Sequence, residues 1–224
     1  MATASVTGFR WAGALLAFGC AVLFVGELRY LPLGPTLGLP SSPAMYADAM
    51  RIALGQESNM RLAGCVSCAG DAVIFAACLA LARRQKMPAY GDLERVAWLL
   101  IGVGFVLAIV FDSLMGTVLG PVASSHQAEL FRAFKGWFDF LFAAGNVFVI
   151  GGVPIFWIDS RSSAPLLPKP LDYVIIGIGI LTAAGGLLYV FGLPVSPLFI
   201  GGTVILATIA LGILGVQIGR REAG

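Results

Sequence analysis

Long apolar runs alternate with short polar stretches along most of this chain. A run of about 20 apolar residues is long enough to cross a bilayer as a helix. Six such runs predict six transmembrane helices, at residues 9–31, 62–81, 96–119, 132–158, 173–193 and 198–218. The fold class that we expect is therefore all-α: a polytopic membrane helix bundle, with residues 1–224 forming a single transmembrane domain.

A longer polar stretch with its own signals separates the first two runs. Residues 31–40 are rich in proline and glycine, which excludes a helix there. Ser42 before Pro43 is typical of a helix start, and Gly55 is a residue at which a helix can end. We expect a short interfacial helix over residues 43–55 on the outer face of the bundle, either as a connector or as a lid over a site. Its apolar stripe would consist of Met45, Ala49, Ile52 and Ala53.

Composition supports a membrane location and narrows the kinds of site. Charged residues make up 12% of the chain, against about 25% in a soluble domain. The single histidine, His126, excludes haem sites with two histidine ligands and catalytic triads that need a histidine base. We expect no metal site, no cofactor and no nucleic-acid partner, and we expect membrane lipid as the surroundings.

The basic residues predict the orientation, because cytoplasmic loops are enriched in lysine and arginine. Nine lie on one side of the predicted spans: Arg10, Arg83, Arg84, Lys86, Arg95, Arg161, Lys169, Arg220 and Arg221. Five lie on the other: Arg29, Arg51, Arg61, Arg132 and Lys135. Both termini are therefore expected in the cytoplasm, in the inner membrane of a bacterium. The first run is longer than the apolar part of a signal peptide, so we expect it to be a span.

Four acidic residues interrupt the apolar runs toward the outer side: Glu27, Asp71, Asp112 and Asp139. A carboxylate at the centre of a membrane helix costs roughly 2.5–3.5 kcal/mol, so such residues face a bundle interior or a wet cavity. We expect the four helix faces that carry them to meet in an outward-facing funnel, with Asp71 at its floor. Asp71 lies farthest from the basic residues of the surface, so it must be protonated, paired or solvated.

The fourth span adds further polar side chains at helical spacing, namely Arg132, Lys135, Asp139 and Asn146. The predicted ligand-binding set is therefore Glu27, Asp71, Asp112, Asp139, Asn146, Lys135 and Arg132. An alternative stays open for Glu27, Asp112 and Asp139, which would pair with nearby basic residues and only hold the helix ends together.

Cys65 and Cys68 form a C-x-x-C at the outer end of the second span. That spacing is found in redox pairs. The aromatic or proline flanks of such pairs are absent here, and small residues are also what helix packing requires. Both interpretations stay open.

Several motifs in the first 95 residues resemble the bacterial six-span membrane proteins of the domain-of-unknown-function 4386 family. They are Phe24-Val25-Gly26-Glu27-Leu28, Met60-Arg61-Leu62-Ala63-Gly64, Gly70-Asp71-Ala72-Val73 and Ala82-Arg83-Arg84. The remainder is similar in topology only, and the fourth span departs from the pattern, with Lys135-Gly136-Trp137-Phe138-Asp139 and no histidine. The resemblance supports the six-span topology and the placing of Glu27 and Asp71, and it implies no activity.

Three functions are compatible with these residues. The first is binding or transport of a small cation, a proton or a lipophilic amine through the acidic funnel. The second is a membrane-embedded enzyme acting on a lipidic or isoprenoid substrate, with Asp71 or Asp112 as the catalytic general acid. The third is a structural or accessory subunit, as a homo-oligomer or within a membrane complex. A closed apolar pocket that ends on one carboxyl group would favour the enzyme.

Overall fold

The computed structural model describes residues 7–30, 33, 43–83, 88–191, 193, 195 and 197–221. Every element in this part of the chain is helical. The elements are α1 (Thr7–Tyr30), α2 (Pro43–Leu81), η3 (Pro88–Tyr90), α3 (Gly91–Leu114), η4 (Met115–Leu119), α4 (Gly120–Ser124), α5 (Ala128–Ile150), α6 (Val153–Arg161), α7 (Lys169–Val190) and α8 (Pro197–Arg221). The all-α fold class is confirmed.

Six stretches of these helices are long and apolar enough to cross a membrane, as predicted. They are Arg10–Tyr30, Tyr46–Leu81, Gly91–Ser124, Ala128–Arg161, Lys169–Tyr189 and Gly202–Arg220. Each overlaps one predicted span. The second, third and fourth extend well beyond the apolar runs, because their helices continue into polar sequence at one or both ends.

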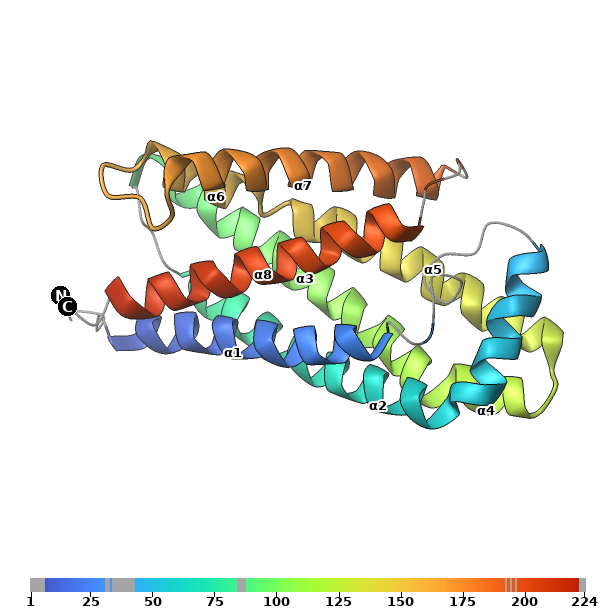
Figure 1. Ribbon diagram of the computed structural model, residues 1–224. Helices are drawn as coiled ribbons and strands as arrows, with labels where there is room; N and C mark the ends of the chain where they lie inside the picture. Colours follow the sequence, from blue (N-terminus) through green and yellow to red (C-terminus); the bar gives the residue numbers. More distant parts are fainter. Residues whose placement is uncertain are drawn as a thin grey trace.

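The long helices run back and forth between two ends of one bundle (Figure 1). Helix α1 packs between α2 and α8, α3 packs between α2 and α5, and α7 lies on α5 and α6. We call the end at which α1 finishes and α5 begins the Tyr30 end. The two chain termini lie at the opposite end (Figure 1).

Glycines of α2 allow α1 and α3 to approach its backbone closely. A Cβ added to Gly70 of α2 would lie 2.6 Å from the backbone nitrogen of Leu23 in α1, and one added to Gly64 would lie 2.7 Å from the Cα of Gly116. Small residues that let backbones meet are the usual basis of helix association in membranes. These contacts fix how α1, α2 and α3 are rotated against one another, and so which side chains lie between them.

Two membrane helices depart from regular α-helix. After α3 the chain forms the π-helical turn η4, one turn beyond Asp112. The fourth span is broken between α5 and α6, where Gly151 and Gly152 donate to carbonyls three residues earlier, at 2.9 and 3.0 Å. Neither feature was predicted from the sequence. In a bilayer such breaks are tolerated where the backbone is covered by protein or lines a cavity.

Residues 43–55 are helical, but the helix does not end at Gly55. It continues into the second span through a kink at Gln56, whose φ of −131° and ψ of 19° are not helical. Figure 1 shows these first turns of α2 standing steeply across the Tyr30 end. Ala49 and Ala53 are fully buried there, in a cluster with Met60, Met115, Leu119, Ala123, Phe131 and Phe138. The segment thus packs on η4, α4 and α5. The Met45 side chain lies outside the described residues.

Candidate carboxyl cluster

Three of the four predicted acidic residues come together between α1, α2 and α3. Asp71 and Asp112 are 1% and 2% exposed, and Glu27 is partly buried beside them. Glu27 lies within electrostatic range of both aspartates. The Asp71 and Asp112 carboxyl groups contact each other, but no hydrogen bond of good geometry joins them. We call Glu27, Asp71 and Asp112 the carboxyl cluster.

Two hydroxyl groups bind the carboxyl cluster from its edges. Tyr30 of α1 donates to Oδ1 of Asp112. Thr208 of α8 lies 3.1 Å from Oε1 of Glu27 and 3.0 Å from the carbonyl oxygen of Val204. A threonine hydroxyl has a single hydrogen to donate, so it cannot fully satisfy both oxygens. A protonated Glu27 that donates to Thr208 would satisfy both contacts.

Several oxygens of the cluster have no hydrogen-bond partner among the described residues. These are both carboxyl oxygens of Asp71, Oε2 of Glu27, and the neighbouring hydroxyl of Ser67. The described lysines and arginines form no ion pair with the cluster either. Arg29 and Arg61, two of the nearby basic residues that could pair with the acidic residues, have exposed side chains. Buried polar groups are nearly always satisfied, so these oxygens are available to a partner other than the described side chains and backbone.

Asp139 does not contact the cluster but pairs with Lys135 one turn earlier on α5. The Lys135 side chain is fully buried, and its Nζ lies 4.8 Å from the centre of the Phe138 ring. The prediction that all four acidic faces meet is therefore fulfilled for three of them. The alternative interpretation, an ion pair, describes Asp139. An i, i+4 pair within one helix gives each charge an opposite charge close by, although Oδ2 of Asp139 has no hydrogen-bond partner among the described residues.

The remaining predicted ligand-binding residues lie elsewhere on α5. Arg132 is exposed, and its guanidinium lies 5.7 Å from the centre of the Tyr46 ring in the 43–55 segment. Asn146 lies deeper in the bundle, and its Nδ2 donates to the carbonyl oxygen of Phe142 at 2.7 Å. Asn146 also lines an apolar pocket against α7 and α8. The seven predicted residues thus divide into the carboxyl cluster, the Lys135–Asp139 pair, and two residues apart from both, Arg132 and Asn146.

The C-x-x-C cysteines are free thiols. Cys65 is exposed, and Cys68 is partly buried with its Sγ 3.6 Å from the hydroxyl of Ser113. The described residues contain no group of three or more histidine, cysteine, aspartate or glutamate side chains arranged to hold a metal ion.

The sequence reasoning missed Tyr30, Ser67 and Thr208 as members of this site. Tyr30 had a recognisable signal, because it lies one helical turn after Glu27 and so shares its face. Thr208 had none, since a lone threonine in an apolar span usually bonds its own backbone. No protein-family model, curated protein or solved structure matches this chain.

Proposed function

We propose that this integral membrane protein binds a proton, or a small monovalent cation in its place, at the carboxyl cluster and transfers it across the bilayer. The observation that carries the proposal is a group of three largely buried carboxyl groups, two of them in contact and the third within electrostatic range, with oxygens that have no hydrogen-bond partner and no cationic partner among the described residues. Burying a charged group without a partner costs several kcal/mol. Uptake of a proton or a cation removes that cost, so the ionised cluster is a strong acceptor of either.

The oxygens of the cluster favour a proton or a weakly coordinated cation over a divalent metal. Divalent ions need several oxygen ligands arranged around one point. The described residues contain no group of three or more histidine, cysteine, aspartate or glutamate side chains arranged in this way. The Asp71–Asp112 contact instead suits a single proton shared by two carboxyl groups.

An enzymatic role receives less support from the geometry. A lipid-modifying enzyme with an aspartic acid as general acid needs an apolar pocket that ends on that carboxyl group. The described apolar pocket lies beside α7 and α8 and presents Asn146 and Thr182 instead.

Access to the cluster requires a movement, because Asp71 and Asp112 are closed off in this conformation. The kink at Gln56 is a natural hinge for the 43–55 segment. This segment packs on Met115, which lies one turn beyond Asp112. We propose that its displacement opens the cluster at the Tyr30 end.

The test is proton movement in liposomes that contain the purified protein and a trapped pH-sensitive dye. An imposed sodium or potassium gradient should drive a pH change in vesicles with the wild-type protein. Asp71→Asn should abolish it, because the amide keeps the shape but binds no proton. Asp48→Asn, at an exposed aspartate that pairs with Arg51, is the matched control and should behave as wild type. Equal flux with Asp71→Asn, or no flux above empty vesicles, would contradict the proposal.

A further inference from the structure

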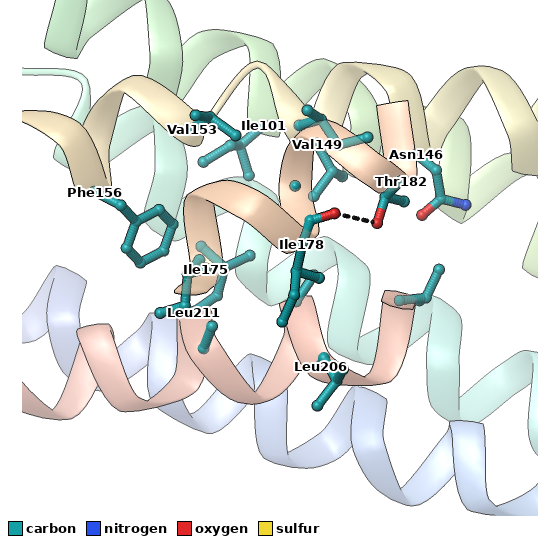
Figure 2. Close-up of a pocket in the computed structure, with 16 residues that line it drawn as sticks. Ile101, Asn146, Val149, Val153, Phe156, Ile175, Ile178, Thr182, Leu206 and Leu211 are labelled. Carbon is teal, nitrogen blue, oxygen red and sulfur yellow. Dashed lines mark hydrogen bonds between the residues drawn. The ribbon is translucent and has the colours of Figure 1, made fainter. Parts of the chain in front are cut away.

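A second site lies on the other side of α8 from the carboxyl cluster. It is a pocket of about 50 Å³ between the α5–α6 break, α7 and α8 (Figure 2). Ile101 of α3 is among its lining residues, and its walls are almost entirely aliphatic or aromatic. Water needs about 10–15 Å³ of such space, so the pocket has room for several methylene groups.

The pocket lies within the membrane-spanning part of the bundle and beside a loose helix contact. Helix α8 packs far more extensively on α1 than on α7. Leu206 lines the pocket and is also about half-exposed on the bundle surface, at 48%. A molecule dissolved in the hydrocarbon core of the bilayer can therefore enter between α7 and α8 without crossing water.

The polar groups of the pocket are mainly acceptors. Figure 2 shows Asn146 and Thr182 together at one side of the pocket, opposite Phe156. The single hydroxyl hydrogen of Thr182 is donated to the Ile178 carbonyl at 2.9 Å, so Oγ1 offers only lone pairs. One amide hydrogen of Asn146 is likewise used by Phe142. The second amide hydrogen and the carbonyl oxygen remain, and Figure 2 shows the oxygen as the atom on the side of Thr182.

The helix break adds a further acceptor. In an unbroken helix the Ile150 carbonyl would accept from the residue four positions later, which is Pro154 and has no N–H. Ile150 lines the pocket. An apolar cavity with surplus acceptors suits a ligand that has a hydrocarbon body and one hydrogen-bond donor.

We propose that this pocket binds the hydrocarbon chain of a lipophilic alcohol, with its hydroxyl group donating to the acceptors at Asn146 and Thr182. The charged groups of the carboxyl cluster take no part. Ala207 lines the pocket, whereas its neighbour Thr208 contacts Glu27. The alcohol site is therefore a separate function from proton binding, and each can fail without the other.

The test uses a long-chain primary alcohol carrying a photoactivatable diazirine, added to the protein in lipid nanodiscs. Labelling of peptides from α7 and α8 should saturate, and unlabelled alcohol should compete far better than the alkane of equal length. Asn146→Leu and Thr182→Val keep the side-chain volume and should each weaken alcohol binding roughly threefold to tenfold, the effect of one hydrogen bond. Ala207→Trp should fill the pocket and abolish saturable labelling.

Two controls keep the outcome clear. Leu187→Trp places the same indole on an exposed position of α7 and should leave labelling unchanged. Asp71→Asn should also leave it unchanged, whatever its effect on proton flux. Labelling that does not saturate would overturn the proposal. So would equal competition by alcohol and alkane together with no effect of Asn146→Leu and Thr182→Val.

Discussion

The buried ion pair on α5 allows a quantitative prediction for stability. Lys135→Met keeps the long apolar stem but leaves Asp139 in the interior without its cation. The Lys135 and Asp139 side chains are 0% and 2% exposed. Breaking such a pair from one side typically costs about 3–5 kcal/mol, because an uncompensated charge stays buried. Asp139 can take up a proton instead, so we expect a loss near 3 kcal/mol in the free energy of unfolding.

The double variant Lys135→Met with Asp139→Leu separates this cost from a general packing defect. It removes both charges, and well-packed apolar replacements of buried pairs are often neutral or stabilising. We therefore expect it to recover most of the loss. Arg132→Met, at an exposed cation one turn away, should cost less than about 1 kcal/mol. Reversible unfolding in mixed detergent micelles, followed by circular dichroism, measures all three. If Lys135→Met lowers the free energy of unfolding no more than Arg132→Met does, the buried charge is not what makes Lys135→Met unstable.

Two further predictions concern helix packing and orientation. Gly64→Ala should destabilise the protein by about 1–3 kcal/mol, because its Cβ would lie 2.7 Å from the Cα of Gly116. The control is Gly55→Ala, whose Cβ meets nothing within 4 Å. It should be neutral or slightly stabilising in the same unfolding assay. Equal effects would show that close approach is not what limits position 64. In a variant without native cysteines, Ser124→Cys should react with an impermeant reagent added outside cells and Ser163→Cys should not. The reverse pattern would overturn the orientation.

Much of the fold was predictable because a bilayer leaves few options. Six apolar runs had to become six helices, since the backbone can satisfy its hydrogen bonds within hydrocarbon only in helices or closed barrels. The start of the 43–55 segment was also readable from Ser42 and Pro43. The continuation of this helix through Gln56 could not be predicted, because Gly55 is as compatible with a kink as with a helix end. The π-turn after Asp112 depends on packing between helices and leaves no pattern in one sequence.

The candidate site was predictable in its residue types but not in its grouping. Helical spacing places Asp139 equally well on a shared polar stripe and one turn from Lys135, and only the structure distinguishes these. The contact between Asp71 and Asp112 depends on how α2 is rotated against α3. That rotation follows from the close approach at Gly64, and the glycine gave no information on which neighbour it would meet.

The proposed function requires that the carboxyl cluster hold a proton inside the membrane. Infrared spectroscopy of the protein in bilayers at neutral pH, in buffer without sodium or potassium, tests it directly, since the carbonyl stretch of a protonated carboxyl group is absent from a carboxylate. We predict such a band in the wild-type protein, a shift of it in heavy water, and its weakening in Asp71→Asn but not in Asp48→Asn. If no protonated-carboxyl band is present, or if Asp71→Asn leaves the band unchanged, the carboxyl cluster does not hold a proton and the proposed function is wrong.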